Sequence, residues 1–597
     1  MAGPVYRIHP AIGITRLGNA DADQFFIGPE YPGVTAKGDP SVGTTVPQFK
    51  VGGLLKPQAA RFRIWEYVEK KGKLEPSREI TLDTKDCVRI VWRVHVANRK
   101  ASFFQFKYLQ GEETTLPPPR RNSGVVNRRT LDIDPLARQI GGRNIKGAKY
   151  EFRKGNSSNP AKELWPTPAP SPPIEYLGEL RTDPAGRLIV IGGKGLSSGI
   201  TGHLLTNTFN NDGWFDDVSD GRVTAELVMK VGGQEKLYGP LNADPQDQVE
   251  GAWVICGPPD FAPSLVNQVT LYDVLYDMAA RQMTLPKNEV LFETILKPLA
   301  DLNAELTSSP KLTKYTPSFD EEIYPIIRRA HDAIFTFELL RTFHRTLDVY
   351  NTLGDPGAAS AKARKDLFDR LHVPGVAVSG VKTMPLMHGD AYSRVGHPRF
   401  SLSLTETQFA MMERWKDGHF VKTAGKFPPV IPKALTDISP HGLDRAALEN
   451  CVGGAFAVGI EVSWQIRNKK LYSASFRINH KAVTQYPGEI GQIQPGHFTR
   501  QMALPWQTDF LGCTLTSGLA WWPAQRPDIV YKTKKDFDDR LKSAALPAWT
   551  RPSATWPSGA SSPNFDEFVK NYYKLGVIRE GPPNYHLEDE RNDPNVP

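Results

Sequence analysis

The residue types best suited to covalent and acid–base chemistry lie together near the C-terminus, in residues 505–528. If this segment is a β-hairpin that turns at Ser517-Gly518, Cys513 pairs with Trp522, and directly paired residues have Cβ atoms about 4.5–5.5 Å apart. Asp509 then shares a strand face with Cys513, because strand side chains alternate between the two faces. The spacing therefore predicts a carboxylate, a thiol and an indole in one place. A buried cysteine packed on a tryptophan is the simpler interpretation of the same spacing.

Most familiar catalytic signatures are missing from the sequence. There is no GxGxxG after a predicted strand, no P-loop, no GxSxG and no HExxH. Their absence argues against nicotinamide and nucleotide cofactors, an α/β hydrolase and a zinc protease. Residues 210–220 are rich in Asp and Asn, but their oxygens do not follow the EF-hand spacing for calcium. We expect an Asx-rich turn with capping carboxylates there, and no metal site.

The elements that must position these residues are strands in the first part of the chain and helices in the middle. Residues 86–98 alternate, which predicts a half-buried strand with Val88, Ile90, Trp92, Val94 and Val96 on one face. Further strands are expected at 187–191, 223–231, 252–256 and 459–466, and a loop at 160–173. From residue 264 the apolar period is helical, and helices are expected at 319–350, 358–371, 406–415, 443–449, 534–544 and 565–573.

This order predicts an α+β fold that is β-rich, with segregated antiparallel sheets and a helical middle section. Three regions are expected along the chain. Residues 1–260 form a β-rich N-terminal region, residues 261–390 are mainly helical, and residues 391–597 form a mixed α+β region that carries the site around Cys513 and Trp522.

Composition excludes several classes of protein. The 597 residues are 40% apolar and 23% charged, which is typical of a folded chain with a sizeable core. The net charge is +8, and the densest basic stretch, residues 120–154, has loop-like flanks, so we expect no nucleic-acid binding. No apolar run is long enough to span a membrane. Four scattered cysteines and the absence of a signal-peptide pattern predict a cytoplasmic protein, or one exported without a recognisable signal.

Three separated blocks of the sequence resemble the LodA-like family of quinoprotein amino acid oxidases, which includes lysine ε-oxidase and glycine oxidase. The first block is 8–14 with Arg16, Gly18, Asn19 and 26–30. The second is 210–221 with 252–253 and 258–263. The third joins 443–449 and 451–454 to 506–507, 509–510, Cys513 and 521–527. The match runs in order along nearly the whole chain.

The resemblance implies a cofactor made from the protein itself, cysteine tryptophylquinone, in which an oxygenated indole is joined to a cysteine by a thioether bond. Cys513 is the implied cysteine, and the implied tryptophan is one of the pair Trp521 and Trp522. The hairpin pairing favours Trp522, whereas a one-residue bulge would select Trp521. No bound NAD, flavin or metal is expected, but a separate flavoprotein that installs the quinone is implied. Assembly into a homo-oligomer is left open.

The implied reaction is oxidative deamination of a free amino acid. The amine that reacts is either the ε-amine of L-lysine or the amine of glycine. A Schiff base with the quinone leads to an aldehyde or keto acid, ammonia and hydrogen peroxide. Asp509 is the expected base, with a pKa raised by an aromatic-lined pocket. The alternative is an unmatured relative that binds amino acids or a partner without catalysis.

Four other residues are candidates for the pocket. Cys451 resembles a family pocket residue that is not cross-linked, and it is equally explained as a small buried side chain. Phe215 is a candidate substrate-facing aromatic or a core residue. His480 and His497 are candidate hydrogen-bond donors, although a single histidine is more often structural.

Overall fold

The computed structural model describes most of the chain, including the elements on either side of the predicted site. The described residues are 3–33, 48–107, 116–239, 248–290, 296–347, 349–377, 384–391, 394, 396–422, 438–455, 462, 464–484, 486–512, 527, 529–530, 535, 549–550, 564–580 and 586–589. Cys513, Trp521 and Trp522 lie outside them, as do almost all of the helix expected at 534–544 and half of the strand expected at 459–466. Of that strand, the described end forms a 3₁₀ turn, η11 (Trp464–Arg467).

Within the described residues, fourteen strands form one large sheet, whose main path runs β10-β11-β12-β6-β2-β18-β15-β8-β9. Its strands are β1 (Val5–His9), β2 (Ile12–Arg16), β3 (Phe26–Ile27), β6 (Gln58–Lys70), β7 (Lys73–Ile80), β8 (Cys87–Ala97), β9 (Arg138–Gly141), β10 (Glu151–Arg153), β11 (Tyr176–Thr182), β12 (Leu188–Ile191), β15 (Ser219–Val231), β16 (Gln234–Tyr238), β17 (Val249–Glu250) and β18 (Ala252–Gly257). Most neighbours are antiparallel, as expected. The pairs β2–β18, β1–β17 and β3–β6 are parallel, which their long chain connections allow.

The remaining strands form two-stranded sheets, and the helices follow the large sheet in the sequence. The small sheets pair β4 (Lys50–Val51) with β5 (Leu54–Leu55), β13 (Ser197–Gly199) with β14 (Trp214–Asp216), β19 (Tyr472–Ala474) with β20 (Arg477–Ile478), β21 (Val483–Thr484) with β22 (Gly491–Gln492), β23 (Ile529–Val530) with β24 (Trp549–Thr550), and β25 (Val577–Glu580) with β26 (His586–Asp589). The helices are α1 (Leu271–Gln282), α3 (Lys297–Leu306), α4 (Tyr324–Asp332), α5 (Glu338–His344), α6 (Tyr350–Leu353), α7 (Ala361–Phe368), α8 (Glu406–Lys416), α9 (Pro440–Glu449), α10 (Trp506–Gly512) and α12 (Phe565–Asn571).

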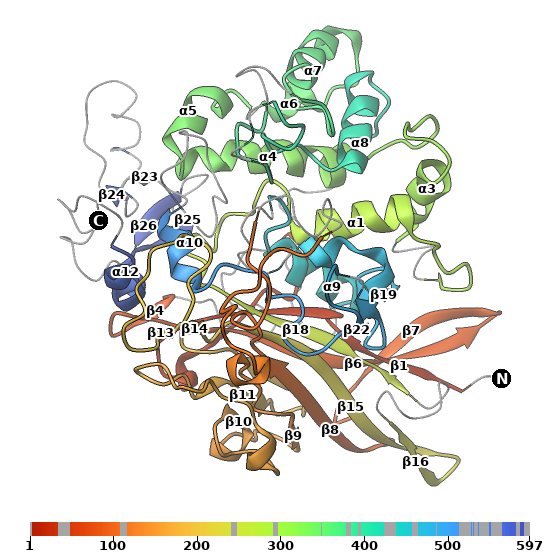
Figure 1. Ribbon diagram of the computed structural model, residues 1–597. Helices are drawn as coiled ribbons and strands as arrows, with labels where there is room; N and C mark the ends of the chain where they lie inside the picture. Colours follow the sequence, from red (N-terminus) through yellow and green to blue (C-terminus); the bar gives the residue numbers. More distant parts are fainter. Residues whose placement is uncertain are drawn as a thin grey trace.

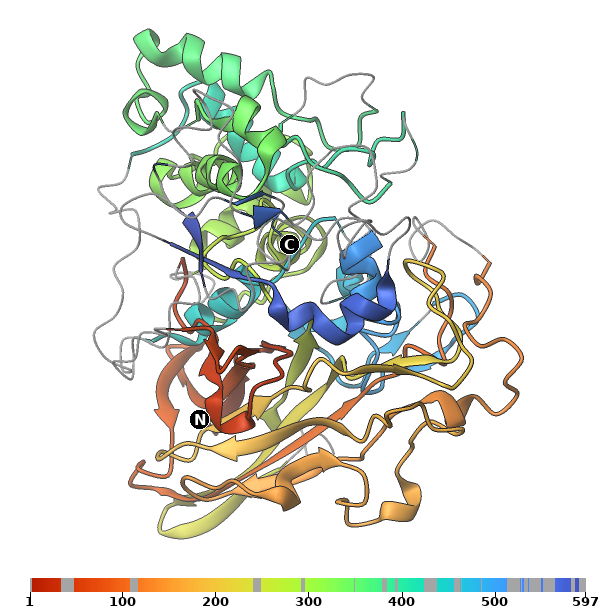
Figure 2. The ribbon, with the colours of Figure 1, turned by 90° about the vertical axis from the view of Figure 1, so that its left-hand side faces the viewer.

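The large sheet and the helices form separate layers, which confirms the α+β class. Figures 1 and 2 show the sheet at the bottom and helices α4 to α8 gathered at the top, with α1 and α9 between them. The central strands β2 and β18 are buried along their whole length because side chains cover both faces of the sheet. No described helix is long and apolar enough to cross a membrane. The proposed division into three regions stays a prediction.

The alternating pattern at 86–98 forms β8, with one local departure. Ile90, Trp92, Val94 and Val96 are buried as expected, but Val88 is 40% exposed. The register between β8 and β15 shifts at this point, since Arg89 pairs with Val228 while Cys87 pairs with Met229. Val88 is therefore the extra residue of a bulge, and a bulge turns its side chain away from the face that the simple alternation predicts.

The long helix expected at 319–350 is instead a series of short ones. A π-turn, η7 (Phe319–Ile323), leads into α4, and a 3₁₀ turn, η8 (Ala333–Phe335), separates α4 from α5. Pro325 at the start of α4 lacks the N–H that a continuous helix would use. Phe337 then adopts extended backbone angles before α5. The apolar spacing had predicted the buried face but not these breaks.

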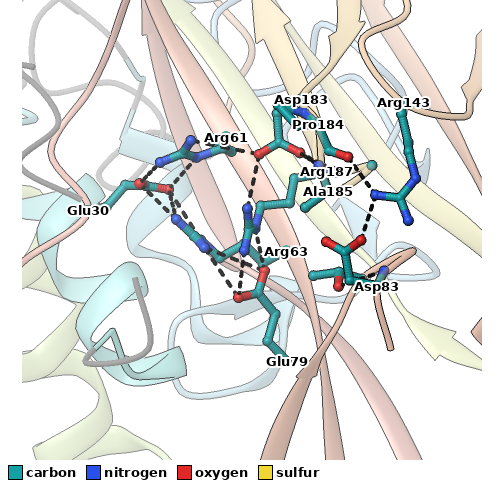
Figure 3. A network of polar contacts seen from close by, with 12 residues as sticks. Glu30, Arg61, Arg63, Glu79, Asp83, Arg143, Asp183, Pro184, Ala185 and Arg187 are labelled. Carbon is teal, nitrogen blue, oxygen red and sulfur yellow. Dashed lines mark hydrogen bonds and ion pairs between the residues drawn. The ribbon is translucent and has the colours of Figure 1, made fainter. Parts of the chain in front are cut away.

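A buried ionic network ties the segment around Glu30 to the large sheet (Figure 3). Arg61 and Arg63 point to the same side of β6, because they are two residues apart. Arg63 Nη2 lies 2.9 Å from both Glu30 carboxylate oxygens, and Arg61 also pairs with Glu30. Glu79 of β7 accepts further hydrogen bonds from Arg63 and Arg187. Opposite charges therefore compensate one another where water has little access.

Glu30 should make the stability of the protein depend on pH below neutrality. Burial raises the pKa of Glu30, but Arg61 and Arg63 outweigh burial and lower the pKa from 4.5 to about 2. A lowered pKa in the folded state means that this stabilisation is present above pH 4.5 and is lost as the pH falls towards 2. A shift of this size corresponds to about 3 kcal/mol of unfolding free energy.

We expect Glu30→Gln to destabilise the protein by about 3–5 kcal/mol at pH 7, because two buried guanidinium groups lose their counter-charge. Urea unfolding at pH 7 and pH 3 measures this, and the difference between variant and parent should shrink at pH 3. Glu235→Gln, at an exposed position on β16, is the matched control. Equal urea midpoints for Glu30→Gln and the parent at pH 7 would show that the prediction is wrong.

Candidate active site

The segment that carries Asp509 is a helix, not the strand of the predicted hairpin. α10 begins at Trp506, directly after Pro505, and ends at Gly512, one residue before Cys513. The hairpin prediction is therefore wrong for residues 506–512. Asp509 still precedes Cys513 by four residues, a spacing that shares a face on a helix as well as on a strand. The mixed apolar and polar pattern of residues 505–512 suits either element, and contacts from distant parts of the chain decide for the helix.

A buried carboxylate fixes the start of α10. Asp216, at the end of β14, accepts the backbone N–H of Trp506 at 3.1 Å. The same carboxylate accepts a hydrogen bond from Asn98 Nδ2 at 2.8 Å and pairs with the ammonium group of Lys100. The side chains of Lys100 and Asp216 are both fully buried. Burial lowers the pKa of Lys100, and Asp216 opposes that effect by stabilising the charged form.

Two side chains of α10 form hydrogen bonds with β13 and with nearby loops. Gln507 accepts a hydrogen bond from Ser197 Oγ at 2.6 Å and donates one to the carbonyl oxygen of Gly195 at 3.1 Å. Thr508 Oγ1 donates to the carbonyl oxygen of Thr208 at 2.8 Å. Asp509 follows these two anchors in the first turn of the helix and is 4% exposed. The hydrogen bonds of the two preceding residues therefore hold the helix at Asp509.

Aromatic rings from α12, from the turn after it, and from residue 261 pack against α10. Phe510 stacks on Phe568 of α12 with ring centroids 5.2 Å apart and meets the edge of Phe261 at 5.3 Å. Trp506 meets Tyr572, which follows α12, at 5.1 Å. α10 and α12 lie side by side at one end of the large sheet in both views (Figures 1 and 2). The carboxylate of Asp509 thus belongs to a helix with a largely apolar surround.

Cys451 lies two residues after the end of α9 and is fully buried. Its carbonyl oxygen accepts the N–H of Leu271, the first residue of α1, at 2.9 Å. Arg16, at the end of β2, links this region to the part of the chain that packs on α10. It donates to the carbonyl oxygens of Asn450 and Pro258 and lies 3.9 Å from the Asp260 carboxylate. Phe261, next in sequence, is the ring that contacts Phe510.

Arg16 and Asp260 were not selected from the sequence as site residues, although both lie in the quoted family blocks. Burial raises the pKa of Asp260, and Arg16 partly opposes that rise. Asp217 was expected from the sequence only as one of the carboxylates of the 210–220 segment. Burial and the neighbouring Asp216 raise its pKa to about 7, against the lowering effect of the Leu196 and Lys194 backbone N–H groups. A carboxyl group that titrates near neutrality is therefore present next to the residue that anchors α10.

The other sequence candidates lie in the core near β18 and β14. His480 Nε2 lies 2.9 Å from the carbonyl oxygen of Ala252, and burial lowers the pKa of this histidine to about 3. His497 is 1% exposed, and burial lowers its pKa well below the usual value. Phe215 is 2% exposed in the core beneath the sheet. At neutral pH both histidines are uncharged, and a role in contacting substrate stays a prediction for all three residues.

The oxygens of the acidic segment 210–220 bind main-chain and side-chain donors of the protein. Asp212 accepts the N–H of Asn122 at 2.7 Å, and Asp217 accepts the N–H of Lys194 at 2.6 Å. Asp220 accepts the N–H and the hydroxyl of Thr499 at 2.9 and 2.6 Å. The expected Asx-rich turn forms only in part, because residues 212–213 are a turn whereas residues 214–216 and 219–220 belong to β14 and β15. Among the described residues, no group of three or more His, Cys, Asp or Glu side chains is arranged to hold a metal ion.

The matches with known proteins agree with this arrangement. Family models described as L-lysine epsilon oxidase N-terminal and L-lysine epsilon oxidase C-terminal domain match residues 9–256 and 386–535. L-lysine 6-oxidase of Marinomonas mediterranea is 29% identical over 572 residues, covering 85% of this chain and 71% of that protein. Two solved structures of the L-Lys epsilon-oxidase from the same organism, one of its Schiff base intermediate with L-Lys, have a TM-score of 0.74 at 24% identity and cover 98% of this chain and 95% of theirs.

The fold and these matches together define an enzyme of the amino acid oxidase class. Within that class, the two domain models span more than half of the sequence, so the chain belongs to the LodA-like family.

The buried ion pair between Lys100 and Asp216 should contribute strongly to the free energy of unfolding. Asp216→Asn leaves the ammonium group of Lys100 buried without a counter-charge, and we expect it to cost about 3–5 kcal/mol of unfolding free energy. Adding Lys100→Met should restore part of the loss, because the uncompensated charge is then gone. Urea midpoints of the parent and the single and double variants measure this. A double variant less stable than Asp216→Asn would contradict the explanation.

Proposed function

We propose that this protein oxidatively deaminates a free amino acid at a cysteine tryptophylquinone formed by Cys513 and one tryptophan of the pair Trp521 and Trp522. The amine, dioxygen and water would yield an aldehyde or keto acid, ammonia and hydrogen peroxide. The observation that supports it best is the placement of Asp509 on α10, four residues before Cys513, by contacts from β14 and β13. The relative named L-lysine 6-oxidase and the solved Schiff base intermediate with L-Lys support the same class of chemistry.

The residues proposed to form the quinone lie outside the described part of the chain, but the described residues that lead up to Cys513 fit such a group. A buried carboxylate and packed aromatic rings suit a covalently attached organic cofactor. The quinone supplies an electrophilic carbonyl and accepts two electrons. Asp509 is the group that would take the proton from the amine-bearing carbon, because its carboxylate is buried on a helix that the hydrogen bonds of Gln507 and Thr508 hold in place.

L-lysine is the favoured substrate and glycine the second. The relative whose name specifies lysine supports this order. Peroxide release measured across the common amino acids and simple amines tests it directly. Activity confined to amines without a carboxylate would refute the amino acid assignment, and activity with glycine alone would reverse the order.

Intact mass tests the cofactor itself. The mature chain should carry two extra oxygen atoms and lack the hydrogens displaced by the two carbonyls and the thioether. A redox-cycling stain on the denatured chain should be positive, because the quinone is covalent. An unmodified mass together with a negative stain, after coexpression with the flavoprotein that we propose as maturation partner, would exclude the quinone.

A further inference from the structure

The described residues line a cavity of about 760 Å³ among the helices, separate from α10. Its walls come from α1, the start of α3, η7 with α4, the start of α8, and α9, and none of its lining residues belongs to α10. Figures 1 and 2 both show α9 and α10 apart from each other. The volume lies within the usual range for pockets that hold small molecules.

A guanidinium group on α9 is directed into this cavity. Arg445 Nε donates to Glu449 Oε1 at 2.8 Å, and its guanidinium lies 5.2 Å from the ring centroid of Tyr272. A third of the Arg445 side chain is exposed, although the residue is surrounded by protein. Within the described residues its other N–H groups have no hydrogen-bond partner. They are therefore available for an anionic group of a ligand, which an arginine can bind with two parallel hydrogen bonds.

Carboxylates without a cationic partner in the described chain also line the cavity. Glu322 accepts hydrogen bonds from the Tyr315 hydroxyl at 2.5 Å and from the N–H of Ser318 at 2.8 Å. Glu321 lies beside it and is exposed. The other acidic groups of the lining are already paired, Asp273 with Arg329 and Asp301 with Lys297. Burial raises the pKa of Glu322, and the positive charge of Arg445 partly opposes that rise, but no ion pair to Glu322 forms within the described residues.

Tyrosine rings lie among these charges. Tyr272, Tyr276 and Tyr315 all line the cavity, and the first two contact each other with ring centroids 5.6 Å apart. Aromatic faces attract cations, most strongly where water is partly excluded. The lining thus combines the donors of Arg445, two carboxylates without an ion pair in the described chain, and an aromatic wall. A ligand that matches it has one carboxylate, two ammonium groups and an apolar middle.

We propose that this cavity binds a free amino acid with a cationic side chain, with its carboxylate on Arg445 and an ammonium group on Glu322. The site is distinct from the one around Asp509, and its occupation does not require the quinone. A diamine lacks the group for Arg445, and a neutral amino acid such as norleucine lacks the second ammonium group. Both should bind more weakly than L-lysine.

Calorimetric titration of the full chain carrying Cys513→Ser tests the binding without turnover. L-lysine should bind, and adding Arg445→Lys or Glu322→Gln should weaken that binding roughly tenfold or more. Exposed Arg129→Lys and Glu235→Gln are matched controls and should change nothing. With Cys513→Ser as the only substitution, norleucine and 1,5-diaminopentane should each bind at least about tenfold more weakly than lysine. Equal affinities across the variants, or across the three ligands, would overturn the proposal.

A second measurement separates this site from the proposed catalytic one. In the chain that keeps Cys513, Arg445→Lys should leave the quinone mass and the Michaelis constant for the oxidised amine unchanged. A tenfold rise in the Michaelis constant at an unchanged turnover number would show that the cavity belongs to the catalytic site instead. If the parent chain proves to hold no quinone, the proposed function fails, while the titration with lysine still decides whether the cavity is occupied.

Discussion

Replacing Cys513 with Ser is expected to abolish both the quinone and peroxide release while leaving the fold intact. The change removes the sulfur needed for the thioether bond, and a hydroxyl of similar size costs little packing. Intact mass should equal the value given by the sequence, and the redox-cycling stain should be negative. The folded state can be checked by the urea midpoint, which should stay close to that of the parent.

Cys87→Ser is the matched control for this experiment. Cys87 begins β8, is partly exposed, and belongs to a strand remote in sequence from the proposed cofactor. This variant should keep the quinone mass and the activity. Normal peroxide release from Cys513→Ser would show that the cofactor assignment is wrong.

Peptide mapping of the parent identifies the tryptophan partner. The hairpin register favoured Trp522, but α10 replaces the first part of that hairpin, so the register no longer decides between Trp521 and Trp522. Trp522→Phe and Trp521→Phe should differ, with only one of them losing the stain. A cross-linked peptide that contains Trp549, the first residue of β24, would move the cofactor outside the proposed pair.

Asp509→Asn is the second change with a large expected effect. Asparagine keeps the shape of the side chain but cannot accept the proton, and loss of a general base typically slows a reaction by about 10²–10⁴. If Asp509 also acts during maturation, the variant will lack the quinone. Peroxide release should therefore be expressed per quinone, with the quinone measured by stain intensity and intact mass.

Asp566→Asn on α12 controls for loss of a negative charge near α10, since Asp566 is exposed in the first turn of that helix. Its activity should match that of the parent. Full activity of Asp509→Asn at normal quinone content would move the base to another group, and Asp217, with a pKa of about 7, is then the next residue to replace.

The sequence alone was informative where a local pattern sets the structure. The alternation in β8 and the apolar spacing of α8, α9 and α12 are each satisfied by residues close in the chain, so their class follows from periodicity. Asn211 accepts hydrogen bonds from the backbone N–H groups of Thr206 and Asn207, as such residues do in turns. The ordered family blocks identified the family, because a match spread over the whole chain does not depend on any single element.

Only the tertiary structure decided features that depend on residues far apart in the sequence. Asp216 meets Trp506 across 290 positions and favours a helix where the local pattern suited a strand equally well. Arg16 joins Asn450 to Pro258, and Glu30 is ionised because Arg61 and Arg63 face it from β6. The cavity at Arg445 and Glu322 is lined by five separate helical segments. Burial and the pairing of charges set these features, and both depend on which distant segments pack together, which periodicity along the chain does not specify.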